Sequence, residues 1–453
     1  MIRGNGKLLR ALVPALAVAL TACTTPAAAP TGSPGGPPAG SPAGSPDMSP
    51  DISPAGSPGA GGEVEIFSWW TAGGEADGLV AMFGVFADTH PQYEIVNAAV
   101  AGGAGTNARA VLATRLQQND PPESWQGHAG QELIGTYVAA DKLESLNFLF
   151  DQEGWLDVMP ELLIPQISQG EDIYSVPVNI HRANVLWYIP EKLTEWGVEA
   201  PATWADFITT ADTLRAAGVS APLAMGEQWT SMHLMETVLL GELGADAYAA
   251  LWDGTGDWSS QEVADALETF ATVIGYTNDD ASTLSWDAAA QLVIDGDAAF
   301  TIMGDWVEGF FVSKDMDPAA GDFGWAPAPG SDGVFQWLSD SFVLPKGAGN
   351  RDGAIAWLTV AGSKEGQDAF NPVKGSIPAR NDGDRSLYDA YLQSAMDDWS
   401  SNELAGSLAH GVVASDAWKA EIDTALGLFL SDLDVPAFQT ALVDACASAG
   451  PCE

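Results

Sequence analysis

Basic residues are scarce in this chain of 453 residues. Lysine and arginine together number 17, against 61 aspartates and glutamates, so the formal net charge at pH 7 is −44. Nucleic-acid binding depends on basic side chains that neutralise phosphates, and an acidic surface repels them. We therefore expect no nucleic-acid partner.

The N-terminal region has no apolar run long enough to cross a bilayer. A short basic region is followed by an apolar run from Ala11 to Leu20 and by small residues directly before Cys23. Because a spanning helix needs about 20 apolar residues, residues 1–22 are predicted to be a cleaved signal peptide. Leu20–Cys23 (LTAC) resembles a bacterial lipobox, which implies a lipidated Cys23 and a lipid-anchored protein on the extracytoplasmic face, periplasmic or cell-surface. The alternative is an ordinary secretion signal in which Cys23 is incidental.

Residues 23–62 lack almost every side chain that could build a core. After Cys23 they consist of Pro, Ala, Gly, Ser and Thr with two aspartates, Met48 and Ile52. Such a composition cannot bury enough apolar surface to fold, so we interpret this stretch as a tether.

Cysteine is also rare. Beyond Cys23 there are only Cys446 and Cys452, close together near the C-terminus. A secreted protein lies in a compartment that permits disulfides, so we expect these two to pair. No His or Cys lies near them, which disfavours a metal site there.

The remainder of the chain has the composition and pattern of a folded α/β protein. The whole sequence is 46% hydrophobic, and residues 61–453 are enough for two lobes. A strand at Val64–Phe67 precedes a helix with Leu79, Met82, Phe83 and Phe86 at helical spacing, and a strand at 93–96 precedes a helix at 106–118. This alternation predicts doubly wound α/β architecture.

Three local patterns refine this prediction. The run Gly102–Gly105 is not a nucleotide-binding loop, because no Gly-Lys-Ser/Thr follows and the spacing does not fit Gly-x-Gly-x-x-Gly. Thr203 lies three residues before Asp206 and is predicted to cap a helix reaching Ala217. A further helix is expected over 287–294.

Seven segments, in the same order over nearly the whole mature chain, resemble those of family 1 extracellular solute-binding proteins, the maltose-binding-protein-like group, and especially its glucose- and galactose-type members. The segments are FSWWTAGGE (67–75), SWQGHAG (124–130), PATWADF (201–207), GDAAFTIMGDW (296–306), LSDSF (338–342), KGSIPAR (374–380) and GSLAHG (406–411).

The resemblance implies a two-lobe periplasmic-binding-protein-like α/β fold (type II) with a sugar in the inter-lobe cleft. It places residues 63–178 and 337–375 in lobe 1, and residues 179–336 and 376–453 in lobe 2. It further implies a monomeric receptor that delivers a monosaccharide such as glucose, galactose or mannose to an ABC-transporter permease, without enzymatic activity, cofactor or metal.

A sugar presents hydroxyls, which donate and accept hydrogen bonds, and flat C–H faces, which pack on aromatic rings. Trp69 and Trp70 follow a strand, where open α/β sheets bind ligands. Adjacent side chains of an extended segment point in opposite directions, so one ring is expected on the sugar and the other to be partly structural. We place Trp70 in the site with Trp69 contributing; burial of both in the core is the alternative.

Polar candidates come from two further segments. Glu75 follows Gly73 and Gly74 near a helix start, where it would also suit the helix dipole. Gln126 and His128 are two apart on a strand end and so share a face. For all three the family match favours ligand binding over capping or core packing.

Other site residues are implied by the resemblance alone. Trp286 would stack on the sugar from the second lobe, Asp340 would accept hydroxyl protons, and Lys374 and His410 would donate. Lys374 near Asp340 would keep that acid ionised. Weaker candidates are Asn179, His181 and Trp306, and the loops around Trp229, Trp252 and Trp258 extend the cleft or simply pack.

Two other functional classes remain open from the sequence. A secreted glycoside hydrolase would need two carboxyl groups in matched geometry, and no segment marks such a pair. The same fold also serves receptors for oligosaccharides or for polyamines, peptides and anions, because fold alone does not determine the ligand.

Overall fold

The computed structural model describes residues 61–102 and 105–452. The signal peptide, Cys23, the tether up to residue 60, and residues 103–104 of the glycine-rich run lie outside the described residues. The described residues belong to one compact unit. Among their helices, none is both long and apolar enough to cross a membrane.

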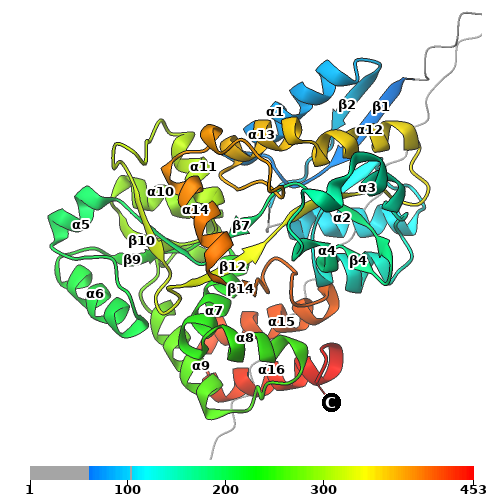
Figure 1. Cartoon of the computed structure of the whole chain (residues 1–453). Coiled ribbons are helices and arrows are strands. Elements are labelled where there is room, and N and C mark those ends of the chain that lie inside the picture. Colours follow the sequence, from blue (N-terminus) through cyan, green and yellow to red (C-terminus); the bar gives the residue numbers. More distant parts are fainter. Residues whose placement is uncertain (1–60, 103–104, 453) are drawn as a thin grey trace, which may run out of the picture. The chain divides into compact units, whose positions relative to one another are not determined.

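One sheet has five strands in the order β2-β1-β3-β13-β6 (Figure 1). β1 pairs in parallel with β2 and β3, whereas β13 is antiparallel to β3 and β6. Helix α1 buries Leu79, Met82 and Phe86, as their spacing predicts, and packs beside α13. The bounds are β1 Gly62–Phe67, β2 Tyr93–Asn97, β3 Ser124–His128, β6 Ser175–Pro177, β13 Asp340–Val343, α1 Gly73–Thr89, α2 Thr106–Gln117, α3 Asn147–Glu153, α4 Leu163–Gln166, α12 Arg351–Gly362 and α13 Lys364–Lys374.

Two further sheets have the orders β11-β8-β10-β9 and β14-β12-β7, and a short pair joins β4 to β5. Antiparallel β8 and parallel β9 flank β10, so this second part of the molecule is also mixed α/β. The strand bounds are β4 Ser168–Gln169, β5 Asp172–Ile173, β7 His181–Arg182, β8 Val185–Tyr188, β9 Ala221–Ala224, β10 Ala298–Ile302, β11 Gly324–Pro327, β12 Val334–Leu338 and β14 Glu403–Gly406.

The helices of the second part surround these sheets (Figure 1). Helix α6 begins as predicted, because the Thr203 hydroxyl accepts the Asp206 amide at 3.1 Å and caps the helix. The bounds are α5 Pro190–Trp196, α6 Trp204–Ala216, α7 Gln228–Leu243, α8 Ala245–Asp253, α9 Gln261–Ile274, α10 Trp286–Asp295, α11 Trp306–Val312, α14 Ala390–Ser401, α15 Asp416–Asp432 and α16 Val435–Ala449.

The cores divide the described chain into two lobes. The N-lobe comprises residues 61–178 and 340–374, and most of its buried apolar side chains form one cluster, whereas Leu163 packs in a cluster of the C-lobe. The C-lobe comprises residues 179–338 and 376–452, with the remaining large clusters. The chain crosses three times, and the crossings are bonded together: the Val178 amide donates to the Asp340 carbonyl and Ile180 bridges Ile377.

One predicted boundary differs from the structure. Residues 337–338 were assigned to lobe 1, but they end β12, which pairs with C-lobe strands β7 and β14. Their side chains also belong to a C-lobe core. The crossing therefore comes at Ser339, between two strands that follow each other almost without a loop.

The C-terminus is held by packing and by a covalent link. Cys446 and Cys452 form a disulfide with their Cα atoms 5.3 Å apart. Trp252 and Trp258, two of the aromatic residues whose role the sequence leaves open, pack against each other in the C-lobe core with ring centroids 5.1 Å apart. They are structural residues.

Candidate functional site

A cavity of about 340 Å³ lies between side chains of the two lobes. The N-lobe contributes Trp69, Glu75, His128, Asp340 and Lys374 to its wall. The C-lobe contributes His181, Trp229, Trp286, Trp306, Phe310 and His410. Its volume falls at the lower end of small-molecule sites, about 300–1,000 Å³, so a small ligand fits it best.

Sheet topology explains why distant residues meet here. Trp69 follows the carboxyl end of β1 and His128 ends the parallel strand β3. β13 runs antiparallel to β3, so its first residue, Asp340, pairs in register with His128. The carboxyl ends of the parallel strands and the start of β13 thus share one sheet edge, the usual ligand position in open α/β sheets.

Asp340 is held by side-chain amides on both carboxylate oxygens. Gln126 Nε2 donates to Oδ1 at 2.8 Å and Asn179 Nδ2 donates to Oδ2 at 2.8 Å. The Asp340 amide in turn donates to Asn179 Oδ1 at 2.8 Å. His128 Nε2 and His181 Nε2 lie 3.7 and 3.6 Å from the two oxygens. This carboxylate is therefore pre-oriented before any ligand arrives.

Gln126 and Asn179 are hydrogen-bonded to Asp340, and the ligand contacts expected of them stay predictions. Neither lines the cavity, and each is buried. The amide group of Gln126 is used at both ends, since its Oε1 also accepts the Trp69 amide at 3.2 Å. With these two hydrogen bonds Gln126 orients both Asp340 and the start of the Trp69 segment.

Two histidines border Asp340 and each is held by a carboxylate. His128 Nδ1 lies 2.8 Å from Glu132 Oε2. Burial opposes ionisation of Glu132, but attraction to His128 and Arg109 outweighs it and lowers its pKa. Glu132 has no local pattern that marks it as functional, and sequence reasoning did not find it.

His181 presents an unsatisfied nitrogen at the cavity. Its Nδ1 contacts the Asp305 carboxylate, and its buried Nε2 has no hydrogen-bond partner in the described protein. Burial lowers the pKa of His181 well below its usual value, so the ring is neutral. A buried polar atom without a partner is costly, so this nitrogen is an unsatisfied group beside the cavity.

Lys374 forms an ion pair at the cavity with Glu75. Its ammonium donates to Glu75 Oε1 at 3.0 Å, and it lies 5.2 Å from the Trp70 ring centroid. Burial raises the pKa of Glu75, and Lys374 opposes that shift. Lys374 thus forms a direct ion pair with Glu75, while its predicted role as a donor to the ligand and its predicted effect on Asp340 stay predictions.

The two adjacent tryptophans both line the cavity but differ in how far they are buried. Trp69 is the half-buried ring at the cavity, stacked at a tilt on His128 with centroids 5.1 Å apart. Trp70 is 1% exposed and packs on Phe342 and Phe370. Adjacent side chains of an extended segment point in opposite directions, and here the N-lobe core receives most of Trp70.

The C-lobe supplies the opposing aromatic wall. Trp286 at the start of α10 and Trp229 at the start of α7 are both half-buried and line the cavity, as does the more buried Trp306. Trp229 was one of three loop tryptophans with no assigned role. Its position at a helix start resembles that of Trp286, and this was the only signal that set it apart from Trp252 and Trp258.

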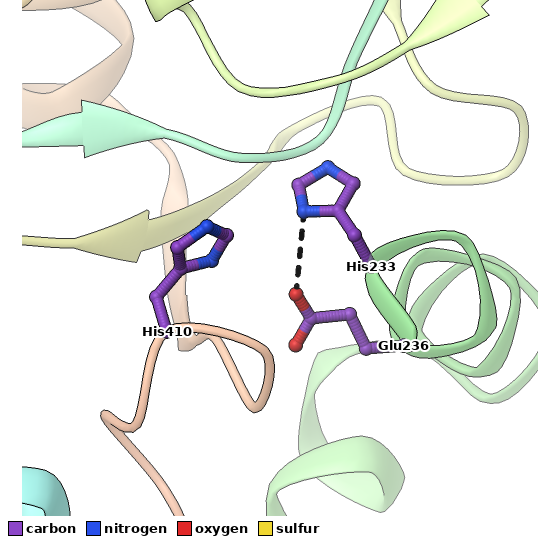
Figure 2. A group of neighbouring side chains, drawn as sticks. All are labelled: His233, Glu236 and His410. Carbon is purple, nitrogen blue, oxygen red and sulfur yellow. Dashed lines mark ion pairs between the residues drawn. The ribbon is translucent and has the colours of Figure 1, made fainter. Parts of the chain in front are cut away.

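His410 joins the cavity to a buried polar cluster with His233 and Glu236, shown in Figure 2. The possible metal-ligand atoms of the three lie within 4.8 Å of one another. The Ser407 hydroxyl, however, already connects Glu236 Oε1, at 2.8 Å, with His410 Nδ1, at 2.9 Å. We therefore assign the cluster to hydrogen bonding rather than to metal binding.

A second cavity, of about 640 Å³, adjoins the first. Glu227 and Trp229 line both. Much of the remaining wall comes from the first turn of α2, with Arg109, and from α15, with Lys419; α7 contributes Gln228 and Met232. Trp229 thus stands between the two spaces.

The two lobes and the polar, aromatic cavity between them define a ligand receptor. The model of the bacterial extracellular solute-binding proteins matches residues 60–368. An uncharacterized ABC transporter extracellular-binding protein of Pyrococcus horikoshii is 33% identical over 84% of this chain and 87% of its own. The xylose/arabinose-binding protein XacG of Haloferax volcanii is 30% identical over 84% of each chain.

The structure of the bacterial solute receptor AcbH is similar with a TM-score of 0.73 and 16% identity, covering 85% of this chain and 97% of AcbH. This chain belongs to the bacterial extracellular solute-binding protein family. It has the mixed α/β periplasmic-binding-protein fold and is a binding protein, not an enzyme, which excludes the glycoside hydrolase considered above.

Proposed function

We propose that this protein is the sugar receptor of an ABC importer and that it binds a monosaccharide such as glucose, galactose or mannose. The observation that carries the proposal is the cavity wall, where half-buried indole rings face a carboxylate already oriented by two amides. Indole faces suit the C–H surface of a sugar, and ionised carboxylates accept strongly from its hydroxyls. XacG is named for two monosaccharides, the pentoses xylose and arabinose, and the Pyrococcus relative is named for an ABC transporter; these names support a monosaccharide receptor of an importer.

Each half of the proposed site supplies both kinds of contact. In the N-lobe, Trp69 lies beside Asp340 and the Glu75–Lys374 pair. In the C-lobe, Trp286 lies with His410. A bound sugar would therefore make contacts in both lobes, which favours closure around it and hand-over of a loaded protein to a permease.

The purified protein is expected to bind a hexose and to leave it unchanged. Titration with glucose, galactose and mannose should alter tryptophan fluorescence, since several indoles line the cavity. A micromolar Kd corresponds to about 8 kcal/mol, which stacking and several hydroxyl contacts can supply. Failure of all three sugars to change the fluorescence or to release heat in calorimetry would contradict the proposal.

A longer saccharide is the second candidate, and the adjoining cavity favours it. The larger space shares Trp229 with the first, so a second sugar unit has room beyond that ring. Titration with matched mono- and disaccharides separates the two ligands. If a disaccharide binds at least tenfold more tightly than either of its units, the ligand is a longer saccharide and the monosaccharide part of the proposal is wrong.

Attachment through Cys23 is also proposed, from the lipobox-like segment Leu20–Cys23. The native protein should fractionate with membranes, and Cys23→Ala should appear in the soluble fraction or remain unprocessed. Cys446→Ala with Cys452→Ala is the matched control, because these cysteines form a disulfide far along the chain from the lipobox. Native protein that is soluble and unmodified in its own cell would exclude the anchor.

A further inference from the structure

We propose that Glu236, acting through Ser407, decides whether His410 offers the ligand a hydrogen-bond donor or an acceptor. Glu236 does not line the cavity, whereas His410 does. Glu236 would thus be a positioning residue that determines specificity from outside the site. The effect on sugar binding rests on the proposed function, but the proton arrangement itself does not.

A continuous hydrogen-bonded chain carries this inference. Glu236 Oε1 is 2.8 Å from Ser407 Oγ, which is 2.9 Å from His410 Nδ1. The other carboxylate oxygen, Oε2, accepts the backbone amides of Leu408 and Ala409, the latter at 3.2 Å. Backbone amides only donate, so a proton on Glu236 must sit on Oε1, directed at Ser407.

The serine hydroxyl allows two complete arrangements. When Glu236 is ionised, Ser407 donates to it and accepts from His410 Nδ1–H, so Nε2 of His410 carries a lone pair. When Glu236 is protonated, it donates to Ser407, Ser407 donates to His410 Nδ1, and the imidazole proton is on Nε2. In both states Ser407 also accepts the His410 amide at 3.3 Å, so no group is left unsatisfied.

The electrostatic environment allows Glu236 to change state while His410 remains neutral. Burial raises the pKa of Glu236 to about 7, against the opposing effect of its hydrogen-bond donors. Burial, together with the nearby His128 and His233, lowers the pKa of His410 well below its usual value. Below pH 7 the Nε2–H form of His410 is therefore expected, and above pH 7 the Nδ1–H form.

His233 faces Glu236 from the same helix and does not stabilise its charge. Its Nε2 lies 3.0 Å from the Ala183 carbonyl, which only accepts, so Nε2 must carry the proton. Burial lowers the pKa of His233 to about 4, so the ring is neutral. Its Nδ1 lone pair then faces Glu236 Oε1 at 3.7 Å, which favours the protonated carboxyl (Figure 2).

Two other titratable groups act on Glu236 from neighbouring helices. Tyr248 of α8 has its hydroxyl 3.3 Å from Oε2, and burial raises its pKa far above the range of interest. Lys419 of α15 contacts the Ala409 carbonyl, and burial lowers its pKa to about 8 while Glu236 opposes that shift. Lys419 would still titrate in a variant without the Glu236 carboxylate. Such a variant therefore separates the effect of Lys419 on the pH dependence from that of Glu236.

The two states of His410 select different ligand atoms. A ring oxygen, or a hydroxyl already donating to Asp340, can only accept and so requires Nε2–H. A hydroxyl with an uncommitted proton can donate to the lone pair of Nε2. Two sugars that place different atoms against His410 should therefore respond differently to pH, so the order of their binding affinities is expected to change with pH.

Histidine NMR on the full chain without sugar tests the proton arrangement directly. The chain has five histidines, and a His410→Asn variant assigns the signals of His410. In the wild type the ring ¹⁵N shifts of His410 should pass from the Nε2–H pattern at pH 6 to the Nδ1–H pattern at pH 8. The same tautomer at both pH values would overturn the proposal.

Glu236→Gln should hold His410 as Nε2–H over the whole range. The Leu408 and Ala409 amides need an acceptor, so the Gln carbonyl faces them and its NH₂ donates to Ser407. Ser407→Ala should also remove the pH-dependent change, and it decides the question if Glu236→Gln does not fold. Glu308→Gln, in another buried carboxyl, is the control and should behave as the wild type. If Glu236→Gln or Ser407→Ala shows the same pH-dependent tautomer change as the wild type, control of His410 by Glu236 through Ser407 is refuted.

Titrations with D-glucose and D-galactose test the consequence for binding. In the wild type the ratio of the two affinities should change by about 3- to 10-fold between pH 6 and 8, the range that one hydrogen bond supplies. In Glu236→Gln it should stay constant. An equal change in both proteins would show that Glu236 does not set specificity. If neither sugar binds, the proposed function fails, but the NMR result still shows whether Glu236 controls the tautomer of His410.

Discussion

Replacing Asp340 by alanine is expected to reduce hexose affinity by about 100-fold or more, the largest loss for any single side chain of the site. Hydrogen bonds to a charged group contribute about 1.5–3 kcal/mol each, and Asp340 lies in the cavity wall with its carboxylate already oriented. Calorimetric titration with glucose and galactose measures the loss. The ranking of the two epimers should change as well, because particular hydroxyls lose their acceptor.

Two control variants separate charge from structure in this experiment. Asp340→Asn keeps the side-chain volume but removes the charge, so it should lose affinity with a smaller effect on folding. Asp352→Ala removes an exposed carboxylate outside the cavity and should bind as the parent does. Asp340→Ala that binds both sugars as the parent does, with a native circular dichroism spectrum, would exclude this residue from the site.

The tryptophan pair should divide into one binding residue and one structural residue. Trp70→Ala is expected to lower the free energy of unfolding by about 3–5 kcal/mol, because it leaves a cavity between Phe342 and Phe370. Trp69→Ala should change that free energy much less, because the Trp69 ring is half-buried at the cavity wall. It should instead reduce the affinity for every hexose by a similar factor.

Urea unfolding and sugar titration of both variants test this division. Each variant is the control for the other, since they differ by one position in the chain and remove the same side chain. The opposite result, with Trp69→Ala unstable and Trp70→Ala stable but unable to bind, would restore the roles predicted from the sequence and would contradict the packing observed here.

Local sequence pattern was sufficient for several of the helices and strands, and the family resemblance added most of the candidate site residues. The helix of Leu79, Met82 and Phe86 follows from its apolar spacing, and the start of α6 follows from the Thr203 cap. These features depend on residues within one or two turns of each other. Trp69, Glu75 and His128 follow from local pattern together with the family resemblance, and His410 from the resemblance alone; the structure places all four at one cavity.

Tertiary structure decided how these residues are used. Gln126 and Asp340 are 214 positions apart, and only the antiparallel pairing of β3 with β13 turns Gln126 toward the carboxylate instead of the cavity. Lys374 pairs with Glu75 across 299 positions for a similar reason. No periodicity within a segment reports such a contact, because it arises from which elements pack together.

The same limit explains the two tryptophans and the histidine cluster. Alternation along the strand indicated that Trp69 and Trp70 point in opposite directions, but only the position of the N-lobe core shows which direction is inward. Glu236 lies within a fully buried stretch of α7, with no motif to distinguish it. Its connection to His410 through Ser407 exists because the chain returns, 171 residues later, to the same buried volume.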